Sequence, residues 1–248
     1  MKVLLSIPSK ARSEILARYT LKWASLLPID WRVFVEQQDV EDYKKVVSAD
    51  RLVVLPQSNQ GLSYAKGVIK KYALENNFDF VFKVDDDIRG FNDFRKKCSP
   101  QETADLVVKT LQEADAYFKQ YPQLGAIAFP YRNEVFVDGL EKKKTKRLQT
   151  CYLIRTHLLY SNPDLKVFED LANSLYVLTA GYQIVLWYRV AMDLGVDVGK
   201  GTGGIQSFDR VALANQSFDI LRKIYPPLLF RKVDKPWKIE PDLRSVKL

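Results

Sequence analysis

The stretch FDFVFKVDDDIRGF at residues 78–91 decides the fold. Its apolar first half is expected to form a buried strand, and this strand leads directly into the adjacent aspartates Asp85, Asp86 and Asp87. Three adjacent carboxylates cannot all be buried without partners, because desolvating unpaired charges costs more than a fold can offset. At the carboxyl end of a parallel strand they would face the crevice in which α/β sheets bind ligands. The stretch therefore predicts a sheet with an anionic, ligand-facing site at this end.

Strand and helix patterns alternate on the amino-terminal side of this stretch. Short apolar runs predict strands at 3–7, 31–35, 52–55 and 78–84. Runs with helical spacing predict helices at 12–26, 40–47 and 62–76, the second of which Asp39 would cap. Short apolar strands separated by helices indicate βαβ units and a mostly parallel sheet.

On the carboxyl-terminal side, Ser99-Pro100-Gln101-Glu102 is a capping box that opens a helix to about Gln120. A strand is expected next, at 124–129, followed by a less regular stretch at 130–165 that mixes short strands with a basic run. The elements expected after it are a strand-like segment at 165–168, a helix at 170–181, a strand at 184–187 and a helix at 208–225. We see no internal repeat and no linker, and therefore expect one α/β domain over residues 1–248, with helices flanking a mostly parallel central sheet.

Composition narrows the class of protein. The 248 residues are 47% hydrophobic and 12% aromatic, which excludes a disordered chain. Two cysteines and one histidine exclude a disulfide-stapled scaffold and provide no zinc-ligand spacing. The longest apolar stretch, 175–188, is too short and too polar to span a bilayer, and the chain start lacks a signal-peptide cleavage site. We therefore expect a soluble cytoplasmic protein with reduced thiols and no membrane partner.

The net charge of +8 is concentrated in two segments. Residues 141–147 (EKKKTKR) carry five basic groups and one acidic group, and residues 219–248 carry eight and four, so each segment contributes +4. Localised positive charge fits a polyanionic partner such as nucleic acid. A solvated lysine-rich loop and a basic tail explain the same charge equally well.

The triple aspartate is typical of a cation site. A hard divalent cation with a bound diphosphate would neutralise such a cluster, and oxygen ligands suit Mg²⁺ or Mn²⁺. In a turn, Asp85 and Asp87 point to the same side, so these two are the expected metal ligands. An acidic turn in which Asp87 caps the following segment is the alternative interpretation.

Three stretches and a later acidic motif resemble the TET-associated glycosyltransferase family, which is found among phage DNA-modifying enzymes. They are IPSKAR at 7–12, LPQSNQGLSYAKGVIKKYA at 55–73, the stretch at 78–91 and, more loosely, FED at 168–170. The resemblance covers residues 3–95 well and 165–205 loosely. It implies a Rossmann-like GT-A fold, with a nucleotide-sugar half at 1–95, an acceptor half at 96–230 and a basic tail at 231–248.

The resemblance implies a donor site for a nucleotide sugar, which we expect to be a UDP-sugar. The residues around it would be Pro8, Ser9, Arg12, Gln60, Gly61, Lys66, Asp85 and Asp86. Gly61 would open the helix whose amino end lines the pocket. The family pattern has an arginine–asparagine pair where this chain has Lys66-Gly67, and lysine keeps a phosphate-directed charge but loses the bidentate fork.

The acidic pair Glu169 and Asp170 is similar to the family's later motif. In enzymes that invert sugar configuration, a carboxylate here accepts the proton of the acceptor hydroxyl as a general base. We expect Asp170 in this role, with Glu169 as the next candidate. The helix dipole also favours acidic residues at a helix start, and a retaining enzyme would need no such base. His157 lies in an apolar stretch, which is typical of a core or surface histidine rather than a metal ligand.

The acceptor implied by the resemblance is a hydroxymethylated pyrimidine in double-stranded DNA, modified in the cytoplasm of a bacterial host if a phage encodes the chain. Phosphate contacts are expected from two sets of residues: Lys142, Lys143, Lys144, Lys146 and Arg147 in the basic run, and Arg231, Lys232, Lys235 and Lys238 in the tail. A flipped-out base calls for an aromatic stacking partner, for which the candidates are Tyr131, Tyr152 and Trp237. The glycine-rich run at 199–204 is suited to a phosphate loop, a mobile lid or an ordinary turn.

Three other functions stay open. The acceptor of a glycosyltransferase could instead be a glycan, a lipid head group or a protein. A two-metal nuclease or nucleotidyltransferase could be built on Asp85 to Asp87 and Glu169, although four strand-helix units ahead of the acids suit a nucleotide sugar better. A non-catalytic DNA-binding protein would leave the three aspartates without a purpose, and no helix-turn-helix or zinc module is evident.

Overall fold

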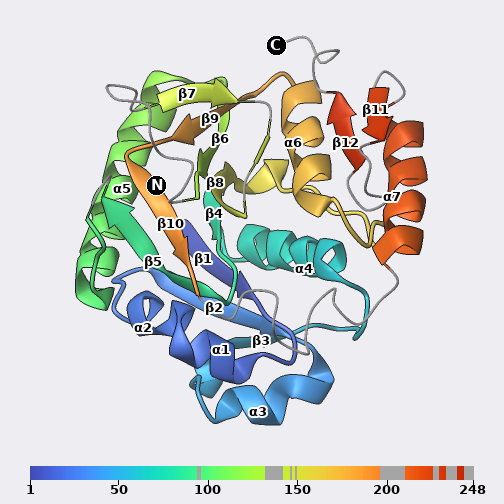
Figure 1. Ribbon diagram of the computed structural model, residues 1–248. Helices are drawn as coiled ribbons and strands as arrows, with labels where there is room; N and C mark the ends of the chain where they lie inside the picture. The colour runs from blue at the N-terminus through green and yellow to red at the C-terminus, as the bar shows by residue number, and fades with distance from the viewer. Residues whose placement is uncertain are drawn as a thin grey trace.

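The computed structural model describes residues 1–93, 96–131, 142–145, 147–148, 150–195, 210–225, 229–232 and 239–242. Its centre is an eight-stranded sheet in the order β3-β2-β1-β4-β8-β6-β9-β7, with helices on both faces (Figure 1). The predicted fold class, a mixed α/β protein with helices around a mostly parallel sheet, is confirmed.

The amino-terminal half of the sheet is parallel, as the alternating pattern predicts. Its strands are β1 (Val3–Pro8), β2 (Asp30–Val35), β3 (Leu52–Val54) and β4 (Phe80–Lys83). They are connected by α1 (Ser13–Arg18), α2 (Thr20–Ala24), α3 (Val40–Lys44) and α4 (Leu62–Glu75). Because all four strands run the same way, the loops that follow them meet at one end of the sheet.

The other half of the sheet mixes directions. Strand β8 (Cys151–Arg155) lies antiparallel between β4 and β6 (Leu124–Phe129). Strand β9 (Gln183–Trp187) is parallel to β6, and the edge strand β7 (Lys142–Thr145) is antiparallel to β9. Four of the seven strand pairings in the sheet are therefore parallel.

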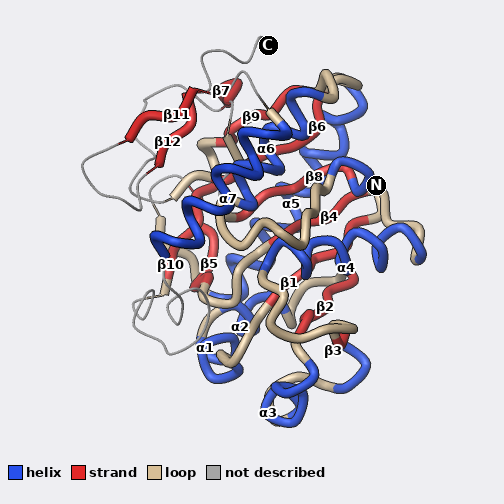
Figure 2. The backbone as a smooth tube through the Cα atoms, turned by 90° about the vertical axis from the view of Figure 1, so that its right-hand side faces the viewer, coloured by secondary structure: helices blue, strands red, loops and turns tan. Residues whose placement is uncertain are grey.

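Two smaller sheets and three further helices complete the described chain. Strands β5 (Ile88–Asp93) and β10 (Val190–Leu194) form an antiparallel pair, and they lie side by side in Figure 2 as well. A second pair joins β11 (Leu229–Lys232) to β12 (Ile239–Asp242). The helices are α5 (Pro100–Gln120), α6 (Glu169–Thr179) and α7 (Arg210–Ile224), and the capping box predicted at Ser99 is present at the start of α5.

Alternate residues of the strands feed two hydrophobic clusters on opposite faces of the sheet. In β1, Leu5 packs on the face covered by α2 and α5, whereas Leu4 packs on the face covered by α4 and α6 (Figure 1). Both are fully buried. This two-sided burial explains why β1 and β4 consist of nearly continuous apolar residues.

Three local expectations are wrong in detail. The helix predicted at 12–26 is interrupted at Tyr19, whose φ of −122° and ψ of −85° are not helical. Asp39 does not cap α3, because its carboxylate instead accepts the backbone N–H of Ala11. The strand-like segment 165–168 is irregular, and it ends at Phe168 in the left-handed conformation.

No helix in the part of the chain that the structure describes is both long and apolar enough to cross a membrane.

Candidate active site

A cavity of about 350 Å³ opens at the carboxyl ends of β1, β2 and β4. It contains six of the residues expected around a donor: Pro8, Ser9, Arg12, Gly61, Asp85 and Asp86. Gln60 and Lys66, which were expected there too, are absent from its lining. The stretches that carry the family resemblance supply five further lining residues, namely Lys10, Leu55, Asn59, Leu62 and Ala65. Four more come from segments that the sequence pattern did not connect with the site, namely Phe34, Glu36, Lys166 and Leu213.

Arg12 binds two of the three aspartates. Its Nη1 atom lies 2.9 Å from Oδ1 of Asp86, and its Nη2 atom lies 3.0 Å from Oδ2 of Asp87. The loop after β1 turns sharply to direct this side chain, since Ala11 has a φ of 51° in the left-handed region. A guanidinium is suited to this task, because its planar fork can reach two carboxylates at once.

Asp86 is the most buried of the three carboxylates. Ser9 donates to its Oδ2 atom at 2.5 Å, and the same Ser9 hydroxyl contacts the hydroxyl of Tyr43. Burial raises the pKa of Asp86 to about 7, although Arg12 and Ser9 both act to lower it. Asp86 therefore anchors the loop, and it also lines the cavity.

Asp85 is the aspartate most open to the cavity. Its side chain is 32% exposed, and its Oδ1 atom lies 2.5 Å from Nζ of Lys83, which also donates to the carbonyl oxygen of Thr150 at 2.9 Å. Burial raises the pKa of Asp85, and Lys83 opposes that effect. Asp85 thus presents a carboxylate that is held from one side and accessible from the other.

The residues present fit a divalent cation that takes few ligands from the protein. No group of three or more His, Cys, Asp or Glu side chains is arranged to hold a metal among the described residues. Asp85 offers an accessible carboxylate, and Asp87 adds a second carboxylate two residues on, of which Arg12 engages the Oδ2 atom. Mg²⁺ is commonly held by one or two carboxylates together with substrate phosphates. The donor set is therefore compatible with a cation that arrives with a diphosphate.

The amino end of α4 provides the positive side of the cavity. Gly61 precedes this helix with a φ of 87°, a conformation that favours glycine. The backbone N–H groups at a helix start favour anions. Lys166 reaches the same place, where its Nζ donates to the carbonyl oxygens of Gln60 at 3.1 Å and Pro163 at 2.9 Å. The sequence analysis missed Lys166, since no local signal connects it to a helix more than 100 residues earlier.

The cavity wall away from the aspartates is apolar with a polar rim. Phe34 and Leu55 are buried side chains of this wall. At the rim, Glu36 accepts the backbone N–H of Asn59 at 2.9 Å and pairs with Lys10 at 3.1 Å. Apolar walls with a few placed polar groups are typical of sites for flat organic rings such as nucleobases.

Asp170 lies in the first turn of α6 and is ion-paired rather than free. Its Oδ1 atom accepts a bond of 2.6 Å from Lys66 of α4, whose side chain is fully buried. Burial opposes ionisation of Asp170, but Lys66 and Lys83 together lower its pKa. Burial, and then the charge of Asp170, raises the pKa of Glu169. The two acids therefore differ in proton affinity although they are adjacent.

One residue of the basic run, Arg147, lies near this acidic pair. Lys144 and Arg147 are exposed, and Arg147 is one of the charges that lower the pKa of Asp170. The segment is fastened to α6, because the backbone N–H of Leu148 donates to Ser174 at 2.8 Å. Lys142 and Lys143 belong to β7, but their side chains lie outside the described residues, as does Lys146.

The aromatic candidates for stacking occupy different places. Tyr152 is fully buried, so it cannot stack on a base. Tyr131 is half-buried, and its hydroxyl contacts that of Thr150. Trp237 and the glycine-rich run at 199–204 lie outside the described residues, and so do Lys235 and Lys238 of the tail; the side chains of Arg231 and Lys232 in β11 also lie outside them.

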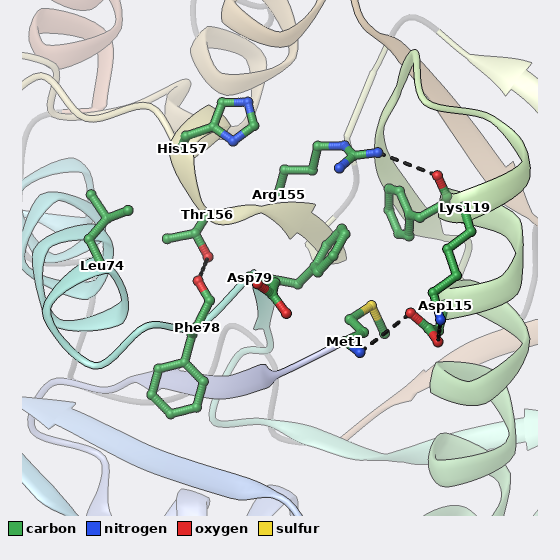
Figure 3. Close-up of a pocket in the computed structure, with 11 residues that line it drawn as sticks. Met1, Leu74, Phe78, Asp79, Asp115, Lys119, Arg155, Thr156 and His157 are labelled. Carbon is green, nitrogen blue, oxygen red and sulfur yellow. Dashed lines mark hydrogen bonds and ion pairs between the residues drawn. The ribbon is translucent and has the colours of Figure 1, made fainter.

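A second cavity, of about 440 Å³, lies at the opposite end of the sheet (Figure 3). It is lined by Asp79, which precedes β4, by Arg155 at the end of β8 and by His157 two residues further on. Its charged groups already have partners, since Arg155 donates to backbone carbonyls and Asp115 pairs with Lys119 at 2.8 Å. His157 thus lies far from the aspartates, at the amino end of β4.

The fold and the site together define a class of protein. A sheet that begins with the strand order 3-2-1-4, carrying an acidic cluster after its fourth strand and a helix start across the cavity, is typical of GT-A glycosyltransferases. The sequence matches the pattern described as TET-Associated Glycosyltransferase over residues 3–195. Because the match covers more than half of the chain, the chain belongs to this family, and the predicted enzyme class is confirmed.

Solved structures extend the likeness in fold. TarS from S. aureus superposes with a TM-score of 0.53 at 17% identity, over 89% of this chain and 40% of TarS, so the chain spans less than half the length of that protein. A putative nucleotide-diphospho-sugar transferase from Desulfovibrio desulfuricans gives a TM-score of 0.45 at 13% identity, over 90% of this chain and 98% of that protein. At 17% identity, the likeness to TarS concerns the fold alone. The chain matches none of the curated proteins with which it was compared.

Proposed function

We propose that the chain transfers a sugar from a nucleotide-sugar donor, a UDP-sugar in our reading, to a hydroxymethylated pyrimidine in DNA. The observation that carries the proposal is that Asp85, the amino end of α4 and Lys166 all line the same cavity. A carboxylate that can hold a cation and a helix start that favours anions are the two groups that a diphosphate needs. We place the reaction in the cytoplasm.

The donor fits the cavity in one orientation. Its nucleobase would lie against Phe34 and Leu55, and its diphosphate would lie between Asp85 and the start of α4. Lys166 would contact the phosphates, because it is a cationic side chain of the lining without a carboxylate partner among the described residues. Asp170 does not line the cavity, but its charge is close enough to raise the pKa of Asp85, so we place the sugar on that side.

Mg²⁺ or Mn²⁺, when bound, would supply positive charge at the leaving diphosphate, with Asp85 and Asp87 as its protein ligands. Arg12 keeps Asp87 in place for that role. The chain's own contribution is to fix the loop, since Arg12 and Ser9 hold the buried Asp86 between the two ligands.

The transfer step, written for inversion of configuration, balances as follows. The acceptor hydroxyl oxygen forms a bond to the anomeric carbon, while the bond from that carbon to the diphosphate oxygen breaks. The hydroxyl proton passes to a carboxylate of the pair Glu169 and Asp170. We propose Asp170 as this base, because ion pairing to Lys66 lowers its pKa and keeps it ionised; Glu169, whose pKa is raised, is the next candidate.

The acceptor assignment rests on charge next to the acids. Arg147 lies within electrostatic range of Asp170, so a phosphate bound by Arg147 would bring a nucleotide close to the reacting carboxylates. Lys144 adds a second exposed cation on the same segment. Two exposed cations beside the acids favour an acceptor that carries phosphate groups, and among such acceptors we propose DNA.

The donor is tested by thermal unfolding with a set of nucleotide sugars, each with and without Mn²⁺. At 100 times its Kd, a donor adds about 2.7 kcal/mol to stability, which raises the Tm of a chain of this size by roughly 5–10 °C. Asp85→Asn and Asp87→Asn should lose the Mn²⁺-dependent part of the rise and abolish transfer, whereas Asp50→Asn, at an exposed acid, should keep both. Full activity in Asp87→Asn would remove Asp87 from the cation site.

The acceptor is tested with duplexes that carry hydroxymethylated or unmodified pyrimidines. We expect label from the donor sugar only in the hydroxymethylated duplex. Arg147→Gln should raise the KM for DNA and reduce its salt dependence by a slope of about 0.9, while Lys45→Gln, at an exposed lysine of the α3 end, should not. Two results would point to a glycan, lipid or protein acceptor instead. One is donor hydrolysis without any labelling of DNA, and the other is an unchanged KM for DNA in Arg147→Gln.

A further inference from the structure

Two lysines are completely enclosed beside the cavity. Lys66 of α4 is 0% exposed and Lys83 of β4 is 1% exposed. Lysines are almost never this buried unless they are paired, because removing an ammonium from water costs several kcal/mol. Both lie next to the residues that the proposed function uses.

Each buried lysine has one carboxylate partner. Lys83 binds Oδ1 of Asp85 at 2.5 Å, and Lys66 binds Oδ1 of Asp170 at 2.6 Å. Among the residues that the structure describes, no bond engages the Oδ2 atom of either carboxylate. The side chains of Asp85 and Asp170 remain 32% and 26% exposed. Each lysine therefore holds its carboxylate from the buried side and leaves one oxygen to the solvent side.

The lysines of both ion pairs lie next to the ring of Tyr152. The ring of Tyr152 is fully buried, with Nζ of Lys66 5.5 Å and Nζ of Lys83 5.9 Å from its centre. The two ammonium groups repel one another, and the aromatic ring beside both of them attracts cations and so offsets part of this repulsion. Backbone contacts fix the arrangement further, since Lys83 also donates to the carbonyl oxygen of Thr150 at 2.9 Å.

A contact between Lys66 and the donor phosphates does not fit this geometry. The side chain is fully buried and does not line the cavity, and its ammonium is already bonded to Asp170. Lys166 and the start of α4 occupy the place where a phosphate-binding cation is needed.

We infer that Lys66 and Lys83 are positioning residues for sugar transfer: Lys83 sets the place of Asp85 on the donor side, and Lys66 sets the place of Asp170 on the acceptor side. The inference rests on the proposed function, because it assigns its effect to two carboxylates of that site. Neither lysine touches a reactant. Their effect is to keep two carboxylates at fixed places that like-charge repulsion would otherwise disturb.

The inference predicts different kinetic defects for the two lysines. Lys66→Met should lower kcat for transfer by about 10²-fold, the usual cost of misplacing a reacting group by about 1 Å, with the donor Kd within twofold of the wild type. Lys83→Met should instead raise the donor Kd in Mn²⁺ by more than tenfold. Lys71→Met is the matched control, because Lys71 is an exposed lysine of the same helix and should leave both quantities unchanged.

Calorimetric titration with the donor and Mn²⁺ separates positioning from misfolding, since the binding stoichiometry gives the folded fraction of each variant. If Lys66→Met does not fold, Lys66→Arg keeps the charge and shifts its donors, and its kcat should again fall more than its donor affinity. A raised donor Kd with an unchanged kcat in either Lys66 variant would overturn the inference, because it would place Lys66 on the phosphates. The inference would also be wrong if kcat fell only in proportion to the folded fraction, because the folded molecules of the variant would then be as active as the wild type.

The test of the acceptor is independent of the test of the two lysines. If DNA is the wrong acceptor, the wild type will hydrolyse the donor without labelling DNA, and the proposed function fails in that respect. The comparison of variants then uses kcat for hydrolysis, in which water takes the place of the acceptor hydroxyl next to Asp170.

Discussion

Replacing Arg12 by methionine should destabilise the protein strongly and in a pH-dependent way. Arg12 makes two charge-assisted bonds, of 2.9 and 3.0 Å, to the carboxylates of Asp86 and Asp87, which are only 5% and 10% exposed. A hydrogen bond to a charged group contributes about 1.5–3 kcal/mol. Because the Arg12 side chain is itself 18% exposed, we take the lower end for each bond and expect a loss of about 3 kcal/mol.

The sign of the pH dependence follows from Asp86. Its pKa is raised to about 7 in the folded protein, from an ordinary value of 3.8, so the folded state binds the extra proton between these pH values. Stability from this group is therefore present at low pH and is lost as the pH rises through the folded pKa. Without Arg12 the pKa of Asp86 rises further, so the loss in Arg12→Met should be larger at pH 8.5 than at pH 6.

Urea unfolding in EDTA at these two pH values measures the effect without a compensating cation. Arg12→Lys should lose roughly half as much, because an ammonium cannot reach both carboxylates in a bidentate fork. Lys44→Met removes an exposed ion pair to Glu41 and should change the unfolding free energy by less than about 0.5 kcal/mol. A loss below about 1 kcal/mol in Arg12→Met, or an equal loss at both pH values, would refute this account of the loop.

Three further predictions concern the frame around the site. Ser99→Ala removes the capping box of α5 and should cost about 1 kcal/mol in urea unfolding; an unchanged midpoint would contradict the cap. A methyl group at Gly125 would lie 2.8 to 2.9 Å from three side chains, so Gly125→Ala should cost roughly 1–3 kcal/mol through overpacking; a neutral effect would mean that these side chains can move apart. Burial, and then the charges of Arg155 and Lys70, lowers the pKa of His157. The Hε1 proton NMR signal of this one histidine should therefore titrate below pH 6.5, and the free energy of unfolding should fall as the pH drops below that value. Titration at or above 6.5 would mean that the ring is more exposed than described.

The amino-terminal half could be predicted from sequence because its signals are local. Each strand there is a short apolar run; β1 ends at Pro8, and Pro56 lies two residues after the end of β3. The capping box at Ser99 is likewise a four-residue pattern, and it starts α5 where expected. Such patterns act within one turn or one strand, so they do not depend on the rest of the chain.

The carboxyl-terminal half could not be predicted to the same depth, because its order is set by long-range pairing. Strand β8 lies between β4 and β6, and nothing in the sequence around Cys151–Arg155 specifies that place. The left-handed conformation of Phe168, with a φ of 64°, is equally unexpected for an aromatic residue. It turns the chain just before Glu169 and so directs the acidic pair, which is a tertiary requirement that overrides local preference.

The same contrast between local and long-range signals explains which site residues could be predicted. The position of Asp85 after a strand was predicted from the sequence, whereas its pairing with Lys83, two residues earlier, was not. The partner of Lys66 was not visible, because Asp170 lies 104 residues further on. A lysine in the helix after a glycine was therefore interpreted as a phosphate ligand, although tertiary packing buries it against an acid.

Charge counting connects the buried lysines with the proposed cation. Among the described residues, the acidic side of the site holds five carboxylates and three cations that form ion pairs with them, which leaves a formal charge of −2 within this group. The acids are Asp85, Asp86, Asp87, Glu169 and Asp170, and the cations are Arg12, Lys66 and Lys83. Protonation of Asp86 near neutral pH relieves part of this excess, and a divalent cation would relieve the rest. A diphosphate would bring its own negative charge toward Lys166 and the start of α4. Cation and donor should therefore bind more tightly together than either does alone, since each neutralises charge that the other would otherwise meet.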